Sequence, residues 1–146
     1  MKTKRFLRLL LMAILTISMI LIALGCKKIA EEATMSDAEC VKYISVRVSD
    51  IEFGRSKTQF TTDSSLYPTV EAEAGSKSCA KKVSVVLLDS SNKIILERAY
   101  NLPPGGKGGE TGYGDFNQGR TLTPGNYKFE FYYGDLLFDT IDIKIE

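Results

Sequence analysis

The stretch NYKFEFYYGDLLFDTIDIKI, residues 126–145, contains two runs of alternating side chains on either side of a short turn. The apolar positions of the two runs are Tyr127, Phe129, Phe131, Tyr133, Ile141, Ile143 and Ile145. A period of two places one set of side chains on each face of a β-strand. Gly134 and Asp135 are turn formers between the runs. The stretch therefore predicts an antiparallel hairpin with one buried face and one exposed face.

Shorter stretches upstream of this hairpin show related patterns. Residues 42–53 (KYISVRVSDIEF) and 68–74 (PTVEAEA) alternate, although the first changes parity near Ser49-Asp50, which predicts a bulge or a strand switch. Residues 81–100 predict two strands around a turn at 89–92, and Val83–Leu88 is apolar on both faces, as in a central strand. With no helical period after residue 40, about seven strands indicate an all-β sandwich.

A local motif refines this prediction. Residues 122–131 (LTPGNYKFEF) have the form L-x-P-G-x-Y-x-F-x-F, which resembles the start of strand F in immunoglobulin-like and fibronectin type III-like domains. The resemblance implies an immunoglobulin-like antiparallel β-sandwich over residues 40–146, with Leu122 packed between the sheets and the Tyr127 hydroxyl bonded to nearby backbone. The chain differs from antibody domains in having no tryptophan, and its cysteines lie far from strand F.

The N-terminal 25 residues have the features of an export signal. Four basic residues precede an apolar stretch over residues 9–24, which is shorter than the ~20 residues that a permanent transmembrane helix needs. Residues 23–26 (ALGC) resemble the lipobox of bacterial lipoproteins, although Ala23 stands where leucine is usual. The alternatives are a secretory signal with an incidental cysteine, or an uncleaved anchor.

The lipoprotein resemblance has several implications. Residues 1–25 would be removed, and Cys26 would receive a diacylglyceryl group and an N-acyl chain that attach it to a membrane. The location would be the bacterial cell envelope, and Lys27 after the cysteine favours the outer membrane if the host has two membranes. Residues 26–39 would then be the lipidated cysteine and a polar tether.

Cys40 and Cys79 remain once Cys26 is assigned to lipid. In an oxidising compartment, a pair of cysteines is most simply a structural disulfide. Two free buried thiols or a redox pair are the alternatives, but redox pairs usually have closely spaced cysteines.

Composition excludes several functions. The signal carries four of the 19 basic residues and none of the 18 acidic ones, so the mature chain has a net charge of −3, which disfavours nucleic acid as a partner. The chain contains no histidine, which excludes Ser-His-Asp and Cys-His catalysis and the usual catalytic zinc sites. No calcium-binding loop motif is present. We therefore expect no catalytic residue, no metal and no cofactor besides the covalent lipid, and we expect that the protein is not an enzyme.

Eight of the 12 glycines lie in residues 101–125. The phosphate-loop spacing is absent, so a phosphate cradle is discounted. Residues 106–109 (GKGG) match the G-x-G-G loop of chagasin-like cysteine-protease inhibitors, which also have an immunoglobulin-like fold, but the other inhibitor motifs are missing. A long connection between strands is the simplest interpretation. As a candidate binding loop we name Lys107, Tyr113 and Phe116. The aromatic residues near this loop are Tyr100, Tyr113, Phe116 and Tyr132. They would form a shallow platform for a glycan or a protein, and the alternative is that they are core edges or isolated surface tyrosines.

The sequence thus predicts a lipid-anchored cell-envelope protein that displays a non-catalytic binding or structural β-sandwich. Its expected partners are the membrane, through the lipid, and a protein or glycan of the envelope. The alternative is an immunoglobulin-like protease inhibitor that acts through the glycine-rich loop at 104–114.

Overall fold

The structure is a computed structural model that describes residues 35–73, 79, 81–102, 109–112 and 114–146. Within these residues there are two short helices, α2 (Asp37–Cys40) and the 3-10 helix η1 (Val41–Tyr43). The strands are β1 (Ile44–Ser49), β2 (Gln59–Phe60), β3 (Tyr67–Ala72), β4 (Val83–Asp89), β5 (Ile94–Tyr100), β6 (Gly109–Thr111), β7 (Gly125–Tyr133) and β8 (Leu136–Ile145). Neither helix in this part of the chain has the length and apolar character of a membrane span.

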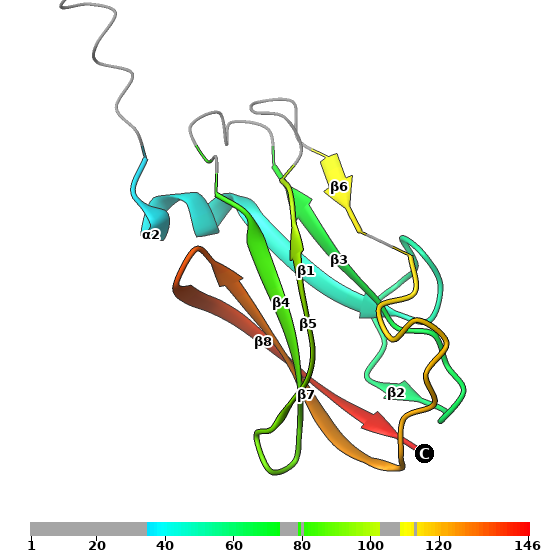
Figure 1. Cartoon of the computed structure of the whole chain (residues 1–146). Coiled ribbons are helices and arrows are strands. Elements are labelled where there is room, and N and C mark those ends of the chain that lie inside the picture. The colour runs from blue at the N-terminus through cyan, green and yellow to red at the C-terminus, as the bar shows by residue number, and fades with distance from the viewer. Residues whose placement is uncertain (1–34, 74–78, 80, 103–108, 113) are drawn as a thin grey trace, which may run out of the picture. The chain divides into compact units, whose positions relative to one another are not determined.

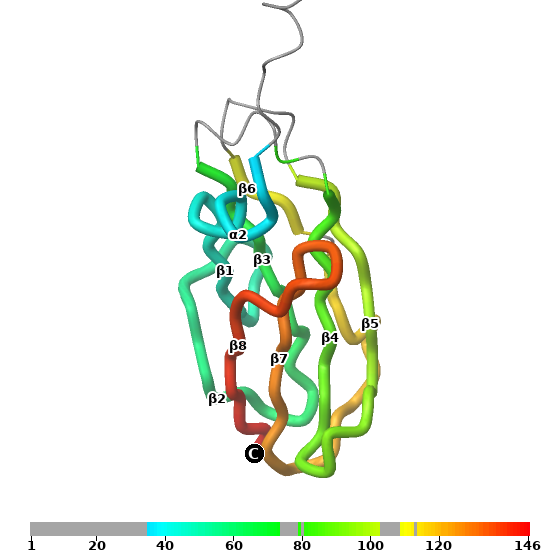
Figure 2. Tube along the Cα trace, turned by 90° about the vertical axis from the view of Figure 1, so that its left-hand side faces the viewer, coloured from blue at the N-terminus to red at the C-terminus, as the bar shows by residue number. Residues whose placement is uncertain are grey.

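The strands form two sheets that pack face to face (Figure 1). The smaller sheet has the order β1-β3-β6, and the larger has the order β2-β8-β7-β4-β5. Figure 2 shows the larger sheet toward the viewer and the smaller sheet behind it. Neighbouring strands are antiparallel, except that β2 runs parallel to β8. The predicted all-β sandwich is therefore confirmed.

The hairpin at residues 126–145 supplies much of the core. The four predicted apolar positions of β7 are buried, and Ile143 and Ile145 of β8 are buried beside them. Gly134 has a φ of 59°, a conformation that glycine adopts without steric cost, and it forms the predicted turn. β4 lies between β7 and β5, as the two-sided apolar pattern of Val83–Leu88 predicted.

The predicted bulge or strand switch after Val48 is wrong. β1 ends at Ser49, whose hydroxyl donates a hydrogen bond to the Ile51 carbonyl at 2.5 Å. The chain then turns, with Phe53 at a φ of 54° and the Gly54 amide bonded to the Ile51 carbonyl. Ile51 and Phe53 are 64% and 47% exposed. The change of parity in the sequence marks the end of the strand.

The predicted tyrosine corner is present. The Tyr127 hydroxyl donates a hydrogen bond to the Thr123 carbonyl at 3.0 Å and lies 2.9 Å from the Thr123 hydroxyl. Leu122 is buried in the core, as the motif implied. The corner ties the start of β7 to the segment that leads into it.

Replacing Tyr127 by phenylalanine should lower the free energy of unfolding by roughly 1 to 2 kcal/mol, because the Thr123 carbonyl loses its donor. Urea unfolding followed by circular dichroism measures this loss. Tyr67→Phe is the matched control, since the Tyr67 hydroxyl makes no hydrogen bond to the residues that the structure describes, and we expect a change within about 0.5 kcal/mol. Equal losses in the two variants would contradict a role for the corner.

A disulfide joins α2 to the segment before β4. The Cys40 and Cys79 sulfurs are 2.08 Å apart and their Cα atoms 5.6 Å apart, so the predicted bridge is confirmed. The Lys81 ammonium pairs with Asp37 at 2.5 Å near the bridge, and Met35 packs against the core. Contacts with the folded domain are therefore made by Met35 and Asp37, which lie in the segment that the sequence assigned to the tether.

Candidate functional site

The structure describes only some of the residues that the sequence predicted as functional. Cys26, Lys107 and Tyr113 lie outside the described residues, so the lipid site and the inhibitory loop at 104–114 stay predictions. Phe116 is described, and its prediction as an exposed contact is corrected. The side chain is fully buried, and its ring packs edge-on against Phe129 with 5.4 Å between centroids.

The burial of Phe116 follows from how its backbone is held. The Phe116 amide donates a hydrogen bond to the Leu66 carbonyl at 2.7 Å, which ties this segment to the residue just before β3. Tyr100 is likewise fully buried, whereas Tyr132 is half-buried on the outer face of β7. The predicted aromatic platform is therefore not formed by Tyr100 and Phe116.

Asn117 is a structural residue that the sequence did not single out. It is 2% exposed, and its Oδ1 accepts a hydrogen bond from the Leu66 amide at 2.8 Å. Its Nδ2 donates to the Ser64 and Arg120 carbonyls at 3.1 and 2.8 Å. An asparagine in a segment that also contains Asp115, Gln118 and Gly119 is typical of an exposed turn, so no sequence signal distinguishes this buried one.

Ion pairs link the three strands of the smaller sheet. Arg47 of β1 contacts Glu71 of β3 at 3.2 Å and Glu110 of β6 at 2.8 Å. Its Nε also donates to the Gly54 carbonyl at 3.0 Å, which fixes the turn after β1. The charge of Arg47 is neutralised by Glu71 and Glu110, and the three side chains link β1, β3 and β6.

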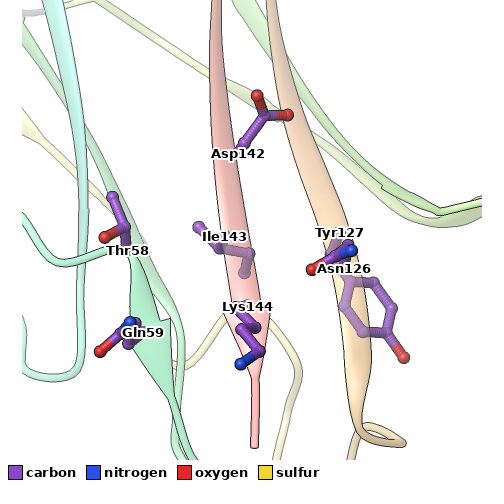
Figure 3. Close-up of a pocket in the computed structure, with 7 residues that line it drawn as sticks. All are labelled: Thr58, Gln59, Asn126, Tyr127, Asp142, Ile143 and Lys144. Carbon is purple, nitrogen blue, oxygen red and sulfur yellow. The ribbon is translucent and has the colours of Figure 1, made fainter.

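A shallow polar groove lies on the larger sheet near the C-terminal end of the chain (Figure 3). Figure 3 shows Asn126 and Tyr127 from β7, Asp142, Ile143 and Lys144 from β8, and Thr58 and Gln59 at β2. The Lys144 ammonium is paired with Glu146 at 2.8 Å, and the Tyr127 hydroxyl is held in the tyrosine corner. The groove offers amide, hydroxyl and charged groups beside the apolar side chain of Ile143, so it does not select one class of ligand.

A second groove, of about 400 Å³, follows the outer face of β4 between β5 and β7. We call it the acidic groove. It is lined by Ser84, Val86, Leu88, Ile94, Glu97, Glu130, Tyr132, Gly134 and Asp135. Its floor includes Val86 and Leu88, which are only 7% and 6% exposed and lie outside the core cluster between the sheets. Val86 pairs with Glu97 on one side and with Glu130 on the other, so a carboxylate flanks the apolar floor on each side.

The Glu130 carboxylate interacts with two neighbouring side chains on β7. The Lys128 ammonium lies 2.7 Å from Glu130, and the Tyr132 hydroxyl donates to Glu130 at 2.6 Å. These two hydrogen bonds, the Lys128 one first, lower the pKa of the Glu130 carboxyl. The bond to Glu130 raises the pKa of Tyr132, as do burial and the charges of Glu130 and Glu97. Glu97 forms no ion pair with any residue in the described part of the chain.

A pH prediction follows from Glu130. A carboxyl whose pKa is lower in the folded state contributes stability above the usual glutamate range and loses that contribution as the pH falls through the folded pKa. Tyr132→Phe removes one of the two bonds, so the pKa of Glu130 should rise. We expect carboxyl NMR titration to show this rise, and the fall in stability on acidification below about pH 4.5 to be less steep than in the wild type. An unchanged Glu130 titration would contradict the assigned hydrogen bond.

Comparison with known proteins supports the fold. No protein-family model and no curated protein matches the sequence. The structure is similar to that of an immunoglobulin-like protein from Pseudomonas aeruginosa, with a TM-score of 0.50 and 12% identity over 78% of this chain and 99% of that chain. The protein thus has an immunoglobulin-like β-sandwich fold, as the motif at 122–131 implied.

Part of a larger protein is also similar. A β-glucosidase from Listeria innocua, solved in complex with gluconolactone, matches with a TM-score of 0.43 and 13% identity. The match covers 70% of this chain and 16% of the enzyme, so this chain spans less than a fifth of that protein's length. A likeness of this extent carries no information on activity.

Proposed function

We propose that this protein is a lipid-anchored component of a bacterial cell envelope, and that its β-sandwich is a non-catalytic binding module. The observation that carries the proposal is the Cys40–Cys79 disulfide. Such bridges persist in exported proteins and are rare in the reducing cytosol. The bridge therefore agrees with the export signal at residues 1–25 and with the resemblance of residues 23–26 to a lipobox.

The arrangement of the domain suits display from a membrane. Acyl chains on Cys26 would hold the chain to the membrane, and two or more chains make such attachment stable. The polar segment that follows would give reach before the contacts of Met35 and α2 begin. In a host with two membranes, Lys27 favours the outer one. The exposed face of the larger sheet would then meet a protein or glycan of the envelope.

Intact mass tests the anchor and the compartment together. Protein isolated from its native envelope should lack residues 1–25, should carry the added mass of the acyl groups, and should have two cysteines that react with an alkylating reagent only after reduction. A mass without lipid would contradict the anchor. Two thiols that react without reduction would contradict an oxidising compartment.

Binding is tested separately by photocrosslinking in intact cells. A photoreactive amino acid at Ala99, which is exposed on β5, should give one discrete crosslinked species, whereas the same group at Asp63, on an exposed turn of the chain, should not. Only diffuse, position-independent products would contradict a specific binding face.

A further inference from the structure

We propose that the acidic groove binds an extended, basic segment of a partner protein, with the stem of a lysine or arginine side chain against Ile94 and its charged end toward Glu97 and Glu130. This inference deepens the proposed function and rests on it for the binding role. It does not depend on the lipid.

Apolar side chains line part of the acidic groove. Outward positions on the neighbouring strands of the larger sheet carry polar residues, including Lys128, Asp142 and Lys144. At the centre of the same face, β4 instead carries Val86 and Leu88, which are only 7% and 6% exposed, and the exposed apolar surface is that of Ile94 at the end of the groove, which is 56% exposed. Lysine and arginine cover such surface with their aliphatic stems while their charged ends stay hydrated.

Three carboxylates line the acidic groove. Glu97 and Glu130 are both in register with Val86, so their Cα atoms are about 10 Å apart, two strand spacings. Asp135 adds a third carboxylate at the end of the groove. Lys128 compensates Glu130, but Glu97 has no ion-pair partner among the described residues. The groove is therefore complementary to a cation, and two basic side chains on one face of an extended segment could use its length.

Charge also decides between classes of partner. Carboxylates repel nucleic acid phosphates and anionic lipid headgroups, and a neutral glycan gains no Coulomb attraction from them. A basic polypeptide gains both the apolar contact and the charge pairing. The raised pKa of Tyr132 is consistent with this field, because the charges of Glu130 and Glu97 both contribute to it.

The test uses the full chain in detergent micelles and fluorescence anisotropy of a labelled octapeptide of alternating lysine and threonine. We expect saturable binding at low salt that weakens as salt is added. An octapeptide of alternating glutamate and threonine should bind at least tenfold more weakly. Absence of binding by the lysine peptide would overturn the proposal.

Matched variants distinguish the groove from a general charge effect. Glu97→Gln with Glu130→Gln should weaken binding of the lysine peptide at least tenfold. Glu52→Gln with Asp63→Asn removes the same charge from exposed turns and should change affinity less than about twofold. Equal losses in both double variants would overturn the proposal. Urea unfolding of each variant verifies that it is folded.

The apolar contact has its own variant. Ile94→Thr keeps the β-branched shape but replaces exposed apolar surface with a hydroxyl, and it should weaken lysine-peptide binding about threefold to tenfold. Unchanged affinity would overturn the placement of the stem against Ile94. If the lysine peptide fails to bind but photocrosslinking from another face yields a discrete partner, the groove assignment falls and the binding function stands.

Discussion

Replacing both Cys40 and Cys79 by alanine should lower the free energy of unfolding by ~4 kcal/mol. The bridge closes a loop with a sequence separation of 39, and the chain entropy that it removes from the unfolded state has about this magnitude. Small domains have only about 5–15 kcal/mol of stability in total, so the loss is a large share. Urea denaturation at equilibrium, followed by tyrosine fluorescence, measures it.

The wild-type protein in a reducing agent is the matched comparison for this variant. It should lose a similar amount of stability if the bridge acts mainly on the unfolded chain. Alanine at both positions leaves no buried polar group without a partner, which keeps the variant interpretable. A double variant as stable as the oxidised wild type would contradict the assigned role of the bridge.

Phe129→Ala should cost roughly 3 to 5 kcal/mol, because it removes a fully buried ring from the centre of the sandwich. Phe129 packs against Phe116 at 5.4 Å and against Phe131 at 6.2 Å between ring centroids. Its loss thus affects both the larger sheet and the segment that Asn117 holds in place. Thermal and urea unfolding provide independent measurements of the change.

Ile94→Ala is the control for the core variant. Ile94 is a large apolar residue on the same sheet, but it is 56% exposed, and we expect its replacement to change stability by less than about 1 kcal/mol. Comparable losses at Ile94 and Phe129 would mean that the core is not centred where the structure places it.

The sequence predicted the parts of the fold that are encoded by local pattern. The β7–β8 hairpin, the two-sided burial of β4 and the tyrosine corner follow from alternation and from one motif of ten residues. The two shortest strands, β2 and β6, were not predicted. Each has only two or three residues, and its pairing partner lies far away in the sequence, so no local periodicity marks it.

The residues of the candidate site were predicted less well than the strands. Phe116 was predicted to be exposed because it lies in a glycine-rich, polar segment. Its side chain is nevertheless buried, and its amide donates a hydrogen bond to the carbonyl of Leu66, a residue far away in the sequence. The acidic groove was not predicted because its lining comes from three neighbouring strands. Val86 and Leu88 are buried as expected, but the strand pairing that places Glu97 and Glu130 beside Val86 leaves no local pattern in the sequence.

The disulfide also determines how the domain would respond to mechanical tension. α2 lies toward one end of the sandwich and the C-terminus lies at the other, as Figures 1 and 2 show. A pull applied between the two ends reaches Cys40 and passes directly through the sulfur–sulfur bond to Cys79 and into β4. The strands β1, β2 and β3 lie inside the closed loop, so the covalent path of the load bypasses them. Under force, the oxidised chain would extend about 130 Å less than the reduced one, and a third of the domain would be shielded from unravelling.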